Sequence, residues 1–331
     1  MSWNLIGHSW VEKTLHFHLA SQNLRHAYLF TGSEGIGRRT LALRFAQAIN
    51  CTNPPTPGEF CGACRICRQI QAQQHADLFV IRPEEDSGII RIDTIRQLQH
   101  SLYLKAYEAA YRIAVLLDFH KANAPAQNAL LKTLEEAPGK VILLLTADSP
   151  ESVLPTISSR CEIFRMRPLT LPQLSDALLS QNAGMTPADA STLAHLAEGR
   201  PGRALAFLND TSLVEKHNEE LQDLLALLPA NRRERFAYCE MAAKEKAGVR
   251  SRLQTWLTFW RDCLMVSHGS LDHIINLGEL ETIRRIGGSI QPVLLQQVIG
   301  ELTNAFQSLD ANANTRLLLE NLLLTWPRQE I

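Results

Sequence analysis

Short apolar runs alternate with amphipathic segments along the first half of the chain. The apolar runs are rich in Ile, Leu, Val and Phe and predict buried strands at Ala27–Thr31, Leu78–Ile81, Ile113–Asp118 and Val141–Thr146, with a shorter one at Cys161–Met166. Helix-period segments follow the first three of them, at Arg38–Ile49, Thr94–Tyr103 and Ala126–Glu136. Strands that alternate with helices are typical of a parallel sheet, so we expect an α/β domain here.

The strand pattern stops after residue 168, and the rest of the chain has helical periodicity. Thr186, followed by Pro187 and then by Asp189, predicts a helix start with a capping box. From about Ser212 onward the apolar faces are rich in leucine, as in LQDLLALL, RLQTWLTFW and RLLLENLLLTW. We therefore predict three domains, namely an α/β domain over residues 1–167, a small helical lid over 168–209 and a helical C-terminal domain over 210–331.

Composition adds bounds on class and compartment. With 331 residues, 45% of them hydrophobic, the chain is long enough to bury the cores of two or three domains. Its 33 basic and 34 acidic residues leave almost no net charge, which argues neither for nor against contact with nucleic acid. The N-terminus has no basic segment before an apolar core, and no apolar run approaches the roughly twenty residues that span a bilayer. We expect a cytoplasmic protein without membrane contact.

Four of the seven cysteines crowd into one short interval, and disulfides are rare in a reducing compartment. Their spacing, C-x9-C-x2-C-x2-C, suits four thiolate ligands of a structural, tetrahedral Zn²⁺, and the residues are Cys51, Cys61, Cys64 and Cys67. A ferredoxin-type iron–sulfur cluster is the rival, but such motifs continue with a further cysteine before proline, where this chain has arginine and glutamine. A closed four-ligand site predicts a structural metal that holds together an insertion over about residues 51–67. We expect His75 to be a surface residue rather than a ligand.

The segment GSEGIGRRT, at residues 32–40, follows the first predicted strand and opens the first predicted helix. Its glycines, whose neighbouring backbone N–H groups could cradle phosphate, are Gly32, Gly35 and Gly37. In the functional pattern G-x-x-x-x-G-K-[ST], a lysine meets the phosphates and a hydroxyl holds Mg²⁺, but Arg38 and Arg39 stand at these positions. Thr40 does not replace the hydroxyl, because one step along a helix turns a side chain by about 100°. Weakened phosphate binding and no binding both stay open.

A second residue type needed for ATP hydrolysis is missing from the segment YRIAVLLDFHKA. An acid at the end of such a strand normally helps to hold Mg²⁺, and Asp118 stands there. The following residue normally activates the attacking water, but here it is Phe119, whose ring can neither accept a proton nor orient water. Both losses predict a chain that does not turn over ATP.

Taken together, RHAYLFTGSEGIGRR, the cysteine cluster, NALLKTLEEAPGKVILLLTAD and LPTISSRC resemble the AAA+ clamp-loader subunits of bacterial DNA polymerase III. The similarity runs from Ile6 to about Leu208, with a further match at NANTRLLLENLLL. It implies a RecA-like parallel sheet with flanking helices, a helical lid and an all-α collar domain that joins subunits. It also implies a zinc module at the cysteines. The substitutions Arg38, Arg39 and Phe119 resemble the delta-prime branch, which has a spoiled nucleotide site and a retained arginine finger.

By this resemblance, Arg160 in the motif SRC would enter the ATP site of a neighbouring motor subunit. The plainer interpretation is a surface arginine that pairs with a carboxylate. Arg203 matches the lid arginine that senses γ-phosphate in motor subunits, and Thr146 matches a polar sensor position. With the local site spoiled, we expect Arg203 to have a helix-start or surface role rather than to sense phosphate, and we likewise do not expect Thr146 to act as a sensor.

The partners implied are gamma/tau-like motor subunits and a delta-like subunit in a hetero-oligomer, with the sliding clamp and primed DNA reached through the complex. Two other functions stay open. One is an active ATPase motor in which Arg38 substitutes for lysine. The other is a zinc-bearing DNA-binding module, although the cysteine region has few cations and only Phe60 as an aromatic platform.

Overall fold

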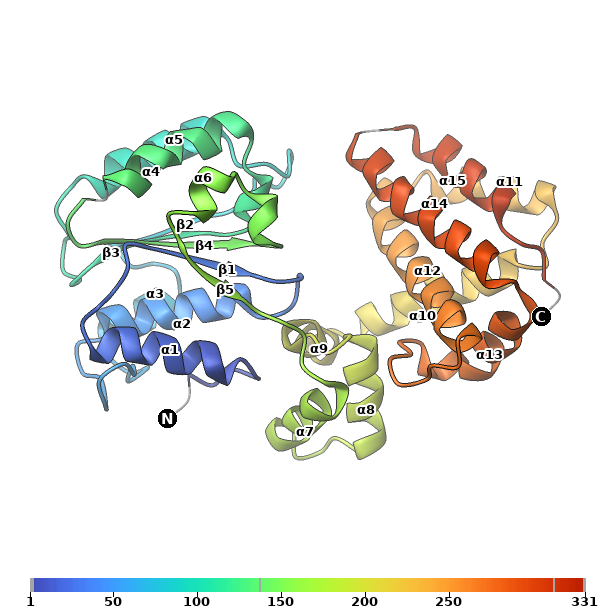
Figure 1. Cartoon of the computed structure of the whole chain (residues 1–331), viewed down its shortest axis with the longest axis horizontal. Coiled ribbons are helices and arrows are strands. Elements are labelled where there is room, and N and C mark those ends of the chain that lie inside the picture. Colours follow the sequence, from blue (N-terminus) through green and yellow to red (C-terminus); the bar gives the residue numbers. More distant parts are fainter. Residues whose placement is uncertain (1–2, 137, 312, 330–331) are drawn as a thin grey trace. The chain divides into compact units, whose positions relative to one another are not determined.

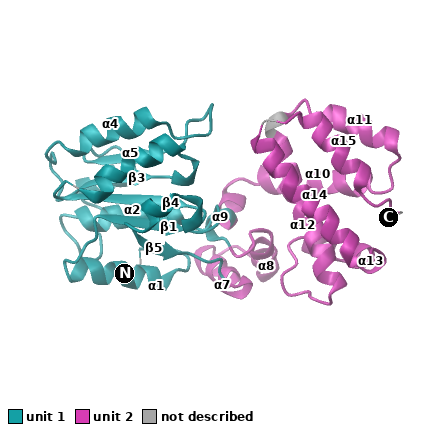
Figure 2. Cartoon of the chain, turned by 45° about the horizontal axis from the view of Figure 1, so that its top comes forward, with its two compact units in different colours: residues 1–169, 200–203 teal, residues 170–199, 204–331 magenta. Residues whose placement is uncertain are grey.

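The computed structural model describes residues 3–136, 138–311 and 313–329. The chain divides into two compact units, coloured separately in Figure 2. The first comprises residues 1–169 and 200–203, and the second comprises residues 170–199 and 204–331. A lid domain of its own at residues 168–209 stays a prediction. No helix within the described ranges combines the length and the apolar character that crossing a bilayer requires.

The first unit is built on a parallel sheet of five strands in the order β2-β3-β4-β1-β5. The strands are β1 (Ala27–Thr31), β2 (Leu78–Ile81), β3 (Arg112–Leu116), β4 (Val141–Ala147) and β5 (Glu162–Arg165). In register, Leu29 of β1 lies opposite Leu145 of β4 and Ile163 of β5. The predicted α/β fold with a parallel sheet is therefore confirmed.

Helices cover both faces of this sheet, as Figure 1 shows. They are α1 (Ser9–Ala20), α2 (Arg38–Asn50), α3 (Arg65–Gln71), α4 (Ile92–Leu102), α5 (Ala124–Glu135) and α6 (Pro155–Ser158), with short 3-10 turns η1 (Phe119–Lys121) and η2 (Pro150–Ser152). Successive strand residues point to opposite faces. Tyr28 and Phe30 of β1 accordingly pack into the core with α1, α2 and α3, whereas Leu29 packs into the core with α4, α5 and α6.

The second unit begins with helices α7 (Leu171–Gln181) and α8 (Pro187–Leu196). The first residues of α9 (Pro201–Asn209), up to Arg203, belong to the first unit, and the rest of the helix belongs to the second. The predicted start of α8 is correct, because Thr186 is the N-cap and accepts the Asp189 N–H at 3.1 Å. The Asp189 carboxylate differs from the expected capping box, since it accepts the Thr186 hydroxyl at 2.7 Å.

The remaining helices of the second unit pack around one apolar core, which confirms the helical C-terminal region. They are α10 (Ser212–Leu227), α11 (Arg232–Ala242), α12 (Lys246–Ser267), α13 (Leu280–Ser289), α14 (Pro292–Asp310) and α15 (Thr315–Thr325), with a 3-10 turn η3 (Leu277–Glu279). Trp256 and Trp260 of α12 are fully buried, and Trp326 packs edge-on against both rings. Arg235 is also buried here and donates to four main-chain carbonyls near the ends of α10 and α15.

Candidate functional site

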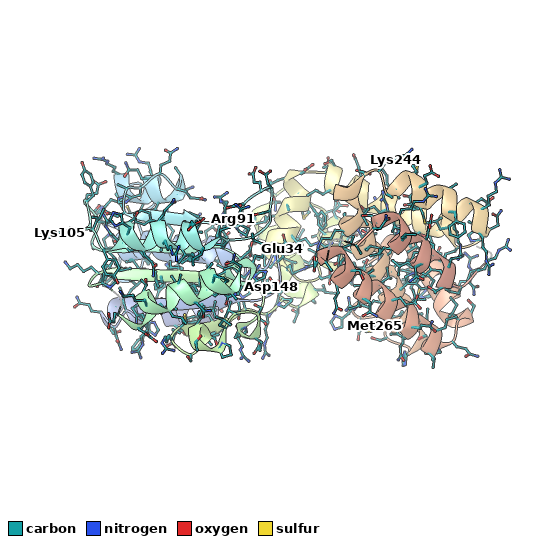
Figure 3. The ribbon with its side chains drawn as sticks, turned by 90° about the horizontal axis from the view of Figure 1, so that it is seen from above. Glu34, Arg91, Lys105, Asp148, Lys244 and Met265 are labelled. Atoms are coloured by element: carbon teal, nitrogen blue, oxygen red, sulfur yellow. The ribbon has the colours of Figure 1, made fainter. Side chains whose placement is uncertain are left out.

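The glycine-rich loop lies where β1 ends and α2 begins. The Gly32 N–H donates to the carbonyls of Ala147 (3.2 Å) and Asp148 (3.0 Å), which follow β4 in the sheet. Gly32 has φ 147°, and a Cβ on it would lie 2.6 Å from the Met166 carbonyl oxygen, so this turn requires glycine. Figure 3 shows Glu34 of the loop and Asp148 after β4 in the first unit. The loop therefore has the strand–turn–helix placement of a phosphate cradle.

Arg38 occupies the inside of this cradle. Its side chain is only 7% exposed, although it opens α2. Nη1 donates to the Gly32 carbonyl and to Asp148 Oδ1, each at 2.6 Å, and Nη2 donates to Asp118 Oδ1 at 3.0 Å. The guanidinium thus joins the ends of β1, β3 and β4 through charge-assisted hydrogen bonds. By contrast, Arg39 and Thr40 are exposed.

Asp118 follows β3 in a left-handed backbone conformation with φ 48°. Its N–H donates to the buried Thr146 hydroxyl at 2.8 Å, and its carboxylate pairs with Arg38. Phe119 is fully buried in the core beneath α5 and lines no polar site. The acid that would help to hold Mg²⁺ and the sensor-position hydroxyl therefore both have partners within the chain.

Asp148 and His120 complete this cluster and were not found by the sequence reasoning. His120 Nε2 lies 3.3 Å from Asp148 Oδ2, on the side opposite Arg38. Burial lowers the pKa of His120 below its usual range, against the opposing effect of Asp148 and Asp118. Arg38 lies as one cation between the carboxylates of Asp118 and Asp148. A signal was present, because Asp148 follows an apolar strand closely, as Asp118 does.

Arg203 lies in the first turn of α9, beside the glycine-rich loop. Its N–H and that of Gly202 donate to the Gly35 carbonyl at 3.2 and 2.7 Å. A Cβ on Gly35 would lie 3.0 Å from the Arg203 Cβ, so the loop and the start of α9 are in close contact. The main chain of Arg203 thus contacts the glycine-rich loop from the first turn of α9.

Arg160 lies just beyond α6, away from the Arg38 cluster in sequence, and is 36% exposed. Nη1 donates to the Thr156 carbonyl at 2.9 Å, and Nη2 donates to Glu135 Oε1 at 2.7 Å. The residue therefore pairs with a carboxylate in this chain and also reaches solvent. Both interpretations from the sequence are compatible with this placement.

The four cysteines predicted to bind metal come together, because their sulfur atoms all lie within 4.8 Å of one another. Backbone N–H groups donate to three of these sulfurs, from Cys61 to Cys51 (3.3 Å), Cys64 to Cys61 (3.2 Å) and Cys67 to Cys64 (3.4 Å). Such donors favour thiolates. Burial opposes this effect at Cys64, but the hydrogen bonds outweigh it and lower its pKa to about 6. The donor set fits a metal with a preference for thiolates, such as Zn²⁺.

His75 is buried, so the prediction of a surface residue is wrong. Its Nδ1 accepts the Asp77 N–H at 3.0 Å, and its Nε2 lies 3.4 Å from Glu108 Oε1. The burial has a tertiary cause, since the loop before β3 folds over the segment that leads into β2. The other half of the prediction agrees with the structure, because His75 is not among the residues grouped around the cysteine sulfurs.

The only aromatic residue proposed as a nucleic-acid platform is already engaged. The Arg44 guanidinium lies over the Phe60 ring, 5.4 Å from its centroid. Arg65, which lies between Cys64 and Cys67, has its Nη2 atom 3.8 Å from Glu108 Oε1. The cysteine region therefore offers little to the phosphate backbone or to bases.

The parallel sheet with helices on both faces and the glycine-rich loop at the carboxyl end of β1 define an α/β chain with a phosphate-loop arrangement. The crystal structure of a DNA polymerase III gamma-subunit-related protein from Thermotoga maritima is similar in fold, with 18% identity, a TM-score of 0.40 and coverage of 95% of this chain and 97% of that one.

The sequence comparisons narrow this class to one family. Residues 7–170 match the family described as DNA polymerase III, delta subunit, and residues 213–328 match its C-terminal family. The chain is 31% identical over 314 residues to the DNA polymerase III subunit delta' of Pseudomonas aeruginosa, with 91% of each chain covered. It is also 32% identical to the DNA polymerase III subunit tau of Bacillus subtilis over 167 residues, which cover 50% of this chain and 29% of that protein. The chain belongs to the delta' family of DNA polymerase III clamp-loader subunits, which act in DNA replication.

Proposed function

We propose that this chain is a clamp-loader subunit that does not hydrolyse ATP itself and supplies Arg160 to the ATP site of a neighbouring motor subunit. Its partners would be gamma/tau-like motor subunits and a delta-like subunit, in a cytoplasmic hetero-oligomer that loads the sliding clamp onto primed DNA. The observation that carries the proposal is the placement of Arg38.

The Arg38 side chain lies inside the glycine-rich loop, where a bound nucleotide would place its phosphates. To bind Mg·ATP in the loop, the chain would have to break three hydrogen bonds of a buried guanidinium, to Gly32, Asp118 and Asp148. The cluster also holds two carboxylates against one cation, so the charge of Arg38 is already compensated within the chain. Phe119, buried in the core, offers no general base.

Arg160 has the exposure and the donors that a finger acting in trans requires. A cation that enters from an adjacent chain stabilises charge on the transferring phosphoryl group, by about 10³–10⁵ in rate. Arg160 is partly exposed, and its contacts within the chain are to one carbonyl and one exposed carboxylate. These contacts leave further guanidinium N–H groups available for a phosphoryl group.

Zn²⁺ is the proposed occupant of the cysteine cluster, in a structural role. Cys51, Cys61, Cys64 and Cys67 would supply all four ligands, so no position stays open for a substrate. When bound, the metal would close the loop between α2 and α3 and fix the start of α3, where Cys64 is the N-cap. Metal analysis of the purified chain tests this assignment, and iron or no metal would contradict it.

The first experiment measures nucleotide binding and turnover by the isolated chain. Binding is followed by titration with a fluorescent ATP analogue in the presence of Mg²⁺, and turnover is measured separately. The isolated chain is expected to show no ATP turnover. Appreciable hydrolysis that Asp118→Asn abolishes would instead identify an active motor subunit. Salt-dependent binding of the isolated chain to DNA would support the nucleic-acid module.

The second experiment tests Arg160 in the assembled complex. Arg160→Ala should leave assembly intact while ATP turnover stimulated by clamp and DNA falls. Arg165→Ala is the matched control, since Arg165 is also an exposed arginine in an ion pair, 3.3 Å from Glu151. If the Arg160→Ala complex kept full stimulated turnover, the finger assignment would be wrong.

A further inference from the structure

Glu135 is the residue against which Arg160 rests, and neither the family match nor the sequence motifs give it a role. It is the last residue of α5, and its Oε1 accepts a hydrogen bond of 2.7 Å from Arg160 Nη2. A second point of contact, the Thr156 carbonyl at the start of α6, accepts from Nη1 at 2.9 Å. The guanidinium is thus held from two different elements.

The position of Glu135 is unfavourable for a carboxylate in the absence of a partner. The C-terminal end of a helix carries a partial negative charge, which disfavours acidic side chains and favours cations. Glu135 and Glu136 both lie at this end of α5. The Arg160 cation compensates the charge at Glu135, so the pair is electrostatically matched to the helix end.

We propose that Glu135 is a positioning residue for Arg160, which holds the guanidinium in the orientation that a neighbouring ATP site receives. The inference rests on the proposed function of Arg160 as a finger in trans. Glu135 touches no phosphate and acts only through the arginine.

Arg160 has enough N–H donors to keep its contacts with Thr156 and Glu135 while it binds a phosphoryl group. A guanidinium has five N–H donors, and the contacts to Thr156 and Glu135 use two of them. The Nε–H and one hydrogen on each Nη nitrogen remain for phosphoryl oxygens. Because two fixed acceptors restrict the long side chain before assembly, less rotamer freedom is lost when the phosphoryl group is met.

The test uses the reconstituted complex with motor subunits, a delta-type subunit, the clamp and primed DNA. The quantity to follow is the Arg160-dependent share of ATP turnover. For each complex that carries Arg160, it is the rate of that complex minus the rate of the complex with Arg160→Ala. Glu135→Ala is expected to lower this share about 1.5- to 5-fold, the range for loss of an exposed ion pair. KM for ATP should stay unchanged, because the arginine acts in the transition state.

Two further variants separate positioning from general stability. Glu135→Gln keeps an acceptor oxygen for Nη2 and should retain more turnover than Glu135→Ala. Glu136→Ala makes the same change of charge one residue away and should leave turnover at the wild-type level. In the background of Arg160→Ala, Glu135→Ala should have no additional effect, since the two residues act as one unit.

The outcomes distinguish this inference from the proposed function. If Arg160→Ala leaves turnover unchanged, the finger assignment fails and the role of Glu135 fails with it. If Arg160→Ala lowers turnover but Glu135→Ala is neutral, or acts equally in the Arg160→Ala background, only the positioning role is refuted. A rise in turnover with Glu135→Ala would show that the carboxylate restrains the finger, which also overturns the proposal.

Discussion

Replacing Arg38 by alanine removes the side chain that fills the glycine-rich loop. Three acceptors lose a charged donor, namely the Gly32 carbonyl and the carboxylates of Asp118 and Asp148. A hydrogen bond from a charged donor to a carbonyl contributes about 1.5–3 kcal/mol. Asp118 and Asp148 are 35% and 54% exposed, so each pair is discounted to about 0.2–1 kcal/mol because water screens it. The sum predicts that the first unit loses about 2–5 kcal/mol of stability.

Hydrogen exchange measured by mass spectrometry is the suitable assay, because the two units can unfold separately and a single global transition would mix them. Amides of β1 and β4 report on the first unit, and those of α12 report on the second. The Arg38→Ala protein should lose protection in β1 and β4 and keep it in α12. Arg39→Ala is the matched control, since this arginine is exposed and an exposed substitution usually changes stability by less than about 0.5 kcal/mol.

The reasoning would be refuted if Arg38→Ala and Arg39→Ala gave the same protection in β1 and β4. Arg38 would then be a passive occupant of the loop rather than a residue that stabilises the first unit. A gain of Mg·ATP turnover in Arg38→Ala would also contradict the proposal, because the buried Phe119 is expected to prevent hydrolysis even when the loop is emptied.

Three further predictions concern Arg235, Asp77 and Cys64. Arg235→Met should destabilise the second unit by about 3–5 kcal/mol, because four carbonyls lose their donor. Urea unfolding followed by tryptophan fluorescence measures this loss, and Arg235→Lys should retain only part of the lost stability. Asp77 accepts N–H groups from residues 107–109, which outweigh burial and lower its pKa below 3.8. A lowered folded-state pKa stabilises the fold above the unfolded pKa and loses that effect as the pH falls through the folded value; the cost of Asp77→Asn in exchange experiments should therefore be full at pH 7 and shrink below about pH 4. Cys64→Ser, or chelation, should remove the metal and the protection of residues 51–71 while β4 stays protected; unchanged exchange in that segment would contradict a structural metal.

The sequence by itself determined the local features of this protein. Strand periods predicted β1 and β2 at their observed bounds, because both strands are continuously apolar. β1 is buried throughout, and β2 is buried or half-buried along its length. The cysteine cluster was readable for a similar reason, since the spacing of Cys61, Cys64 and Cys67 brings the sulfurs together within one turn and one helix start.

Only the tertiary structure decided which residues meet across the sheet. The order β2-β3-β4-β1-β5 brings the ends of β1, β3 and β4 together, so Arg38 reaches carboxylates 80 and 110 positions away. The sequence reported that a lysine was missing, but not that its replacement turns inward to neutralise Asp118 and Asp148. The burial of His75 and the support of Arg160 by Glu135 have the same origin, because charge and burial depend on contacts between segments that periodicity along the chain does not encode.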